Sequence, residues 1–256
     1  MFSAADVSAV LRNVKDLTFH EYIEDMMERF GSTSAGLQAM WAPSSPSLEA
    51  VEGLQPNPLQ RPLAHLAEGF MKSQLHPGAL FDELQSKTLK LLSDKCIWSG
   101  MSSEAILSPG KDSMQRKVSL LKWTQRTIVE CASKAFFGPA LLEMDSALLD
   151  HFSHFDDDIW QLLYRIPKPW SSKMLESKAK LHQAILKYIQ LPPRRREDAC
   201  WLVRTTEREM RARMIGETDI AANLMMVFWV YVQLPILLDL GHLSFQAARL
   251  IHLLQM

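Results

Sequence analysis

The sequence has 256 residues, a mass of 29.2 kDa, and 28 Lys and Arg against 29 Asp and Glu, which gives a formal net charge of −1. This length supports a sizeable hydrophobic core, and 47% hydrophobic against 22% charged residues excludes a disordered chain. The balanced charge argues against a dedicated nucleic-acid-binding protein, which needs a basic face. Cys96, Cys131 and Cys200 are too widely spaced for a disulfide framework or a zinc site. With no secretory signal at the N-terminus, we expect an intracellular globular protein.

Apolar residues recur with helical spacing along most of the chain, and the few glycines and prolines favour helices over many short strands and turns. Prolines and serines gather in residues 43–62, which are predicted to form a long surface loop, and residues 101–115 are predicted to be irregular. The predicted helices cover residues 5–14, 19–30, 63–76, 80–92, 118–137, 148–163, 173–190 and a segment from 220 onward. The sequence shows no repeat and no convincing strand, so the predicted fold is mainly α.

Two charged segments are candidates for binding sites, and for both we favour a structural interpretation. His151 and His154 share a helix face that could ligate a metal, but Phe152, Phe155 and Ile159 need the buried side of that helix. We interpret this acidic segment as a solvated helix edge. The second segment is a candidate for phosphate binding through Arg194, Arg195, Arg196, Arg204, Arg208, Arg211 and Arg213. Four acidic residues among these arginines, and no interleaved aromatic residues, predict an exposed helix with many salt bridges and no nucleic-acid contact.

Residues 220–238 carry no formal charge over 19 positions, a length that is sufficient to span a bilayer. If this segment spanned a membrane, the arginines before it would place its N-terminal end on the cytoplasmic side. Asn223, Gln233 and Pro235 interrupt the segment, however, and Thr218 is a suitable N-cap for an ordinary helix. A central helix buried on all sides is the favoured prediction, and a membrane-spanning helix is the alternative.

Several segments, taken in order, resemble the cytochrome P-450 family of haem-thiolate monooxygenases, and the likeness is strongest to fungal relatives of the sterol 7-alpha- and 12-alpha-hydroxylase branch. The similar segments are Ser3–Asn13, Leu17–Met27, Phe70–Gly78, Trp123 with Ala135–Gly138, Phe155–Asp157 and Asp219–Trp229. The resemblance implies that residues 1–232 form a partial cytochrome P-450-like domain, from the B helix to the I helix. Residues 233–256 are an apolar tail that matches nothing in the family.

The resemblance also implies where a site would lie. The segment from residue 220 would be the I helix, which crosses the haem face, and residues 43–62 would be the variable loop over the substrate pocket. The candidate residues for contact with the haem propionates are His65 and Lys72. The candidates for the substrate-facing surface are Asn223, Val227 and Val230.

Members of this family use haem b, O₂ and electrons from an NADPH-dependent reductase to oxygenate lipophilic molecules such as sterols, terpenoids and other secondary metabolites. They associate with the endoplasmic-reticulum membrane. The sequence lacks the family's Glu-x-x-Arg pair, its haem-ligating cysteine in a Phe-x-x-Gly-x-x-x-x-Cys loop, and its N-terminal anchor helix. In this family the I helix carries an acid–alcohol pair that activates oxygen. Gly216–Thr218 superficially resembles that pair, but it lies too early in the sequence to be it. We therefore expect a truncated relative that is inactive as an oxygenase by itself.

Two functions outside catalysis remain open. One is a non-enzymatic helical remnant that binds a partner or a lipophilic ligand, because loss of the second half of the fold would expose apolar helix faces. The other is a small membrane protein that is anchored by residues 220–238.

Overall fold

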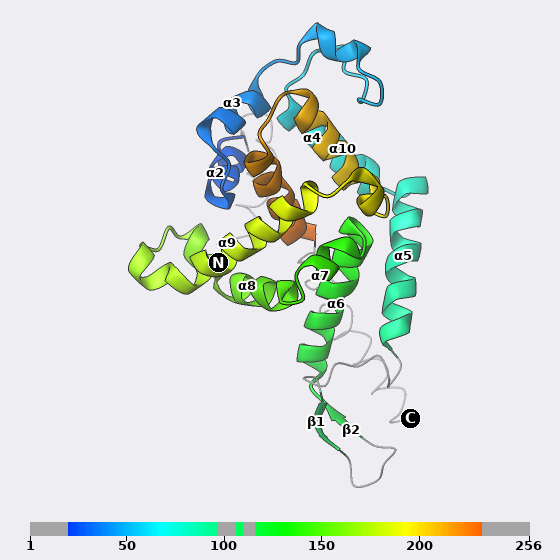
Figure 1. Cartoon of the computed structure of the whole chain (residues 1–256), viewed down its shortest axis with the longest axis vertical. Helices are drawn as coiled ribbons and strands as arrows, with labels where there is room; N and C mark the ends of the chain where they lie inside the picture. The colour runs from blue at the N-terminus through cyan, green and yellow to red at the C-terminus, as the bar shows by residue number, and fades with distance from the viewer. Residues whose placement is uncertain (1–19, 97–105, 110–115, 232–256) are drawn as a thin grey trace, which may run out of the picture.

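The computed structural model of the chain describes residues 20–96, 106–109 and 116–231, and this part is mainly helical (Figure 1). Its helices are α2 (His20–Phe30), α3 (Ser34–Trp41), α4 (Leu63–Leu75), α5 (Ala79–Lys95), α6 (Leu120–Phe137), α7 (Ala140–Met144), α8 (Leu148–Leu163), α9 (Lys168–Ile189), α10 (Trp201–Ala212) and the helical residues 217–231. Short 3-10 helices cover Pro46–Ala50 and Pro193–Arg196. The predicted helix over 5–14 and the tail 233–256 lie outside the described residues.

Most helices begin and end near the predicted residues, because the signals that bound them are local. α8 spans the predicted residues 148–163. α6 ends at Gly138, where a φ of 75° requires the left-handed conformation that glycine adopts without steric cost. α9 begins at Lys168 rather than at Lys173, because Pro169 lies in its first turn, where the missing N–H of proline is not needed.

Two predictions are wrong for the segment before α6. Residues 106–109 form strand β1 (Ile106–Pro109) rather than irregular chain, and Val118 ends strand β2 (Arg116–Val118) rather than beginning a helix. The two strands pair antiparallel as a ribbon below α6 (Figure 1). Strands this short give no periodic signal, so the sequence pattern could not reveal their pairing.

The helical residues 217–231 pack in the hydrophobic core of the part of the chain that the structure describes, as predicted for a central helix. Ile220, Ala221 and Leu224 have no exposed surface. Phe228 packs edge-on against Phe137 of α6 and Phe152 of α8, with ring centroids 5.5 and 5.0 Å apart. Among the helices that the structure describes, none has the length and apolar character needed to cross a membrane.

The start of this helix corrects the capping prediction. Residue 217 is already helical, so Thr218 lies in the first turn rather than at the N-cap. The carboxylate of Asp219 instead accepts hydrogen bonds from the N–H and the hydroxyl of Thr33, at 2.6 and 3.1 Å. Thr33 in turn caps α3 by accepting the N–H of Gly36. Asp219 therefore joins the starts of two helices that are far apart in sequence.

Three pairs of neighbouring helices surround the core, and one of these helices, α10, contacts the loop of residues 43–62. α8 lies beside α9, α5 beside α6, and α4 beside α10 (Figure 1). Gln74 joins the last pair, because its buried amide accepts the N–H of Leu202 at 3.0 Å and donates to the carbonyl of Leu80 at 2.8 Å. The loop leaves α3 and returns into α4, and α10 is the helix that it contacts.

Candidate functional site

The loop of residues 43–62 is closed on itself by hydrogen bonds between its two ends. The N–H of Ser44 donates to the carbonyl of Gln60 at 3.0 Å, and the Ser44 hydroxyl donates to the carbonyl of Arg61 at 2.7 Å. Asn57 makes two further hydrogen bonds with the backbone of Arg61. The predicted loop is confirmed, and its closed shape comes from its own polar groups.

Between this loop and α10 lies a cavity of about 320 Å³, which we call the loop cavity. Its lining combines apolar and polar side chains, namely Leu48, Val51, Leu54, Pro56 and Pro58 with Ser44, Ser45, Gln55 and Asn57 from the loop, and Glu209 and Arg213 from α10 and its C-cap. The volume is at the lower end of the range for small-molecule pockets. Such pockets are lined mostly by apolar side chains with a few polar groups, whereas this lining combines five apolar with six polar or charged residues.

Glu209 and Arg213 form a buried ion pair beside the loop cavity. Arg213 Nη1 lies 2.5 Å from Glu209 Oε2, and the two side chains are only 9% and 1% exposed, respectively. Glu209 Oε1 accepts the N–H of Gln55 at 2.6 Å, and Arg213 Nη2 donates to the hydroxyl of Ser44 at 3.0 Å. Arg213 Nε is buried and has no hydrogen-bond partner among the described residues. The ion pair thus holds the loop through Gln55 and Ser44, while the Nε donor of Arg213 has no hydrogen-bond partner among the described residues.

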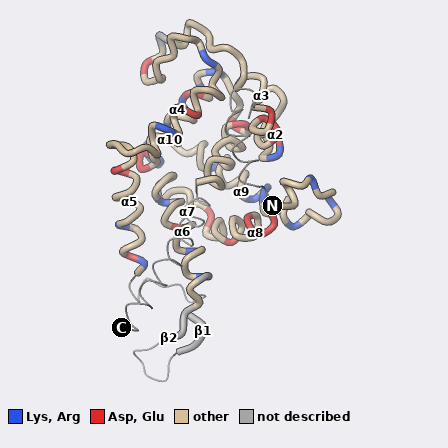
Figure 2. Tube along the Cα trace, turned by 180° about the vertical axis from the view of Figure 1, so that it is seen from behind, with Lys and Arg blue, Asp and Glu red and all other residues tan. Residues whose placement is uncertain are grey.

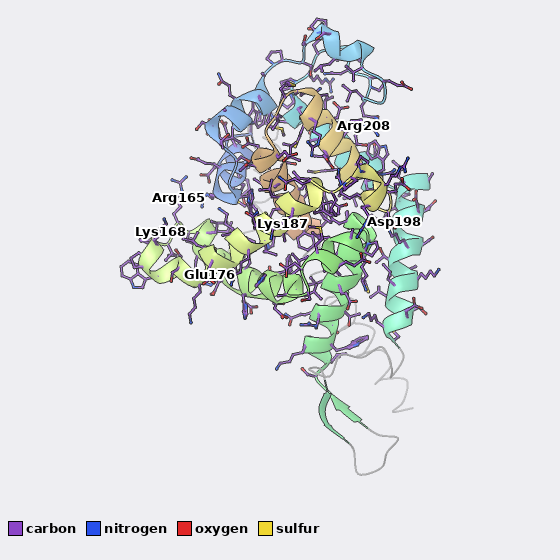
Figure 3. The ribbon with its side chains drawn as sticks, viewed as in Figure 1. Arg165, Lys168, Glu176, Lys187, Asp198 and Arg208 are labelled. Carbon is purple, nitrogen blue, oxygen red and sulfur yellow. The ribbon has the colours of Figure 1, made fainter. Side chains whose placement is uncertain are left out.

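The tip of the loop is attached to α10 by Arg208. Its Nη1 donates to the carbonyl of Gly53 at 2.9 Å, at the place where α10 meets the loop (Figure 3). Gly53 has a φ of +84°, and a Cβ there would lie 2.8 Å from Arg208 Nη1. The backbone conformation therefore favours glycine at this position, whereas the guanidinium lies at the end of a flexible side chain that can shift.

A second charge network corrects the prediction that α10 is exposed throughout. Glu207 is buried and accepts hydrogen bonds from Arg196, on the preceding 3-10 helix, and from Arg211. The Arg196 guanidinium also lies over the ring of Tyr188, 5.4 Å from its centroid. The predicted salt bridges are present, but Glu207 and Glu209 are both buried, although they lie on different sides of α10. Figure 2 shows Lys and Arg interspersed with Asp and Glu along the described helices.

His65 and Lys72 lie on one side of α4, and neither lines the loop cavity. His65 packs against Trp41 and His20, with ring centroids 5.6 and 4.8 Å away, and its Nε2 is buried with no hydrogen-bond partner in the described part of the chain. Lys72 is exposed and lies 2.6 Å from Glu68, and this contact holds the pKa of Glu68 below its usual value. A role of either residue toward haem propionates stays a prediction.

Asn223, Val227 and Val230 lie on one face of the helical residues 217–231, as their spacing implies. Asn223 and Val227 are buried, and Val230 is half-buried against the core. None of the three lines the loop cavity. Their role toward a substrate stays a prediction.

A thiolate-bound haem needs a cysteine whose sulfur reaches the iron. All three cysteines of the sequence lie in described residues. Burial raises the pKa of the Cys131 and Cys200 thiols to about 11, so both stay neutral thiols near neutral pH. Cys96 is exposed at the C-cap of α5. The pKa of a free thiol does not decide iron ligation, because a bound metal displaces the proton. None of the three cysteines lines the loop cavity, and their role toward haem stays a prediction.

The His151–Asp158 segment confirms one prediction and corrects another. Phe152, Phe155 and Ile159 are buried, as predicted. Asp156 is not part of a solvated edge, because its Oδ1 accepts Nε1–H of Trp229 at 3.0 Å and burial raises its pKa. Within the described residues, no group of three His, Cys, Asp or Glu is arranged to ligate a metal.

The sequence singled out Arg213 only as a phosphate-binding candidate and residues 43–62 only as a loop over a substrate pocket, and it did not bring the two together. Glu209 and Arg213 are spaced by four residues, which predicts an ion pair on one helix face, but the same spacing is common on solvated helices. Their burial depends on the loop from another part of the chain. Ser44 and Gln55 gave no signal beyond that of an ordinary polar loop.

No protein-family model matches the chain, and neither a curated protein nor a solved structure matches it.

Proposed function

We propose that this chain is a relative of the helical part of the cytochrome P-450 fold and that it binds a small lipophilic molecule in the loop cavity, without oxygenating it alone. The observation that carries ligand binding is the cavity of about 320 Å³ with five apolar side chains in its lining. Burial of apolar ligand surface is favourable by about 25 cal/mol per Å². The loop is closed by its own hydrogen bonds, so little ordering is needed when a ligand enters.

Binding of Nile red, an uncharged dye that fluoresces in apolar surroundings, tests this proposal. We expect saturable binding by the wild type and at least a tenfold loss, about 1.4 kcal/mol, in Leu48→Trp, because the larger side chain occupies the cavity. Leu59→Trp is the matched control, since Leu59 belongs to the same loop but is exposed and lies outside the cavity lining. Equal loss of binding in both variants, or in neither, would contradict the proposal.

The second part of the proposal, that the chain alone is not an oxygenase, is tested with haem. After addition of haem b, reduction and exposure to carbon monoxide, we expect no Soret band of thiolate-ligated iron, because none of the three cysteines lies in the family's Phe-x-x-Gly-x-x-x-x-Cys loop. If the wild type gave that band and one Cys→Ser variant lost it, this part of the proposal would be wrong.

Oxygenation with an NADPH-dependent reductase and association with the endoplasmic-reticulum membrane stay predictions from the resemblance. Reductase-dependent turnover of a lipophilic substrate would test the first. Fractionation of cell extracts would test the second.

A further inference from the structure

We infer that a groove along α10, outside the loop cavity, binds an organic phosphate monoester. The groove has a volume of about 700 Å³ and lies between the end of α9, the 3-10 helix Pro193–Arg196, α10 and the start of the helical residues 217–231. We call it the α10 groove. It shares no lining residue with the loop cavity, so the inference stands independently of the proposed function.

The acids in the lining of the α10 groove do not cancel its basic charge. The lining carries four arginines and three glutamates, which leaves a net charge of +1. Glu207 is buried and pairs with Arg196 and Arg211, and Glu217 pairs with Arg211 as well. These four side chains neutralise one another, so the binding of an anion depends on the other charged residues of the lining.

Arg204 and Arg208 are the arginines that a ligand can reach. Both are exposed, and a spacing of four residues places them on the same face of α10. The guanidinium of Arg204 makes no hydrogen bond or ion pair within the described part of the chain, and Arg208 uses one of its five N–H donors, on the carbonyl of Gly53. Two guanidinium groups one helical turn apart can share the oxygens of a phosphate group, whose charge of about −1.5 to −2 matches theirs.

The rest of the lining favours a phosphate that carries an apolar group. Glu197 is the only acid of the lining with no ion pair among the described residues, and it opposes part of the charge of the two arginines. A dianionic phosphate therefore gains more from the remaining positive charge than a carboxylate does, because Coulomb energy scales with the charge of the ligand. Leu191, Pro192 and Pro193 add apolar surface beside the arginines, and an organic group on the phosphate gains free energy by covering it.

Isothermal titration calorimetry with phenyl phosphate tests the ligand class. We expect saturable binding with a Kd below about 1 mM, and binding of benzoate and of inorganic phosphate that is at least about fivefold weaker. Benzoate carries a single charge, and inorganic phosphate lacks the apolar group. The absence of saturable binding of phenyl phosphate, or equal binding of either comparison molecule, would overturn the inference, while binding of Nile red in the loop cavity would be unaffected.

Two substitutions test the arginines directly. Arg204→Gln and Arg208→Gln are each expected to weaken the binding of phenyl phosphate at least about fivefold. Arg194→Gln is the matched control, because Arg194 is an exposed arginine of the neighbouring 3-10 helix and lies outside the groove lining. Unchanged binding in both groove variants, or an equal loss in the control, would overturn the inference.

Removal of the opposing acid tests the same site in the other direction. Glu197→Gln is expected to strengthen the binding of phenyl phosphate at least about twofold, because the lining loses a negative charge. A gain of affinity cannot result from loss of the fold, which circular dichroism checks in all four variants. Weaker or unchanged binding by a folded Glu197→Gln protein would overturn the inference.

Discussion

Replacement of Phe228 by alanine is expected to lower the free energy of unfolding by about 3–5 kcal/mol. Phe228 is 2% exposed and contacts Phe137 and Phe152 edge-on, so it connects the helical residues 217–231 to α6 and α8. Truncation removes the buried ring and leaves a cavity between three helices that are fixed by their other contacts. Incomplete collapse of that cavity adds to the lost burial.

Urea denaturation followed by circular dichroism measures this effect. Phe228→Leu is expected to lose less stability than Phe228→Ala, because the leucine side chain fills part of the space. Met214→Ala is the control, since Met214 is 90% exposed and its truncation is expected to change stability little. A loss of less than about 1 kcal/mol in Phe228→Ala would show that this ring is not in the core.

Replacement of Asp219 by alanine is expected to cost about 2–3 kcal/mol, because hydrogen bonds to a charged group are stronger than those between neutral groups. Asp219 is 8% exposed and accepts both the N–H and the hydroxyl of Thr33. Without the carboxylate, the N–H of Thr33 loses its partner at the start of α3. Glu217→Ala is the matched control in the same helical turn, because the ion pair of Glu217 with Arg211 is exposed and screened by solvent.

The close approach of Gly36 to Asp219 gives a second test of this contact. A Cβ on residue 36 would overlap the carboxylate of Asp219, so Gly36→Ala is expected to destabilise the wild type. The same substitution is expected to cost less in the Asp219→Ala background, where the overlapping group is absent. Strictly additive effects in the double variant would contradict the contact.

Helix boundaries were the part of the fold that the sequence predicted best. α8 matches its predicted range because Pro167 and Pro169 follow it, and Gly138 ends α6 because few other residues adopt its backbone conformation. The strands β1 and β2 were missed, since their pairing joins segments too short to carry a pattern. α10 was predicted to be exposed because its arginines and acids alternate, yet Glu207 and Glu209 are buried.

The candidate site was the part that the sequence predicted least. The resemblance implied that residues 43–62 cover a substrate pocket; a cavity lies between these residues and α10, and its role toward a substrate stays a prediction. The predicted residues His65, Lys72, Asn223, Val227 and Val230 do not line it. Its charged residues come from α10, which lies about 150 residues farther along the chain than the loop. Which loop packs on which helix depends on the packing of the whole core, and no local pattern records it.

The mainly helical fold and most helix boundaries were predictable from the sequence, and a buried central helix from residue 220 was its favoured prediction. Helical periodicity, prolines and glycines act within a few residues, so the chain carries these properties locally. Three other properties depend on the tertiary structure: the shielding of Glu209 and Arg213 from water, the hydrogen bonds of Asp219 to Thr33 at the N-cap of α3, and the burial that keeps two thiols neutral near neutral pH. Hydrogen-bond partners and solvent exposure are set by groups that meet only when distant segments pack together.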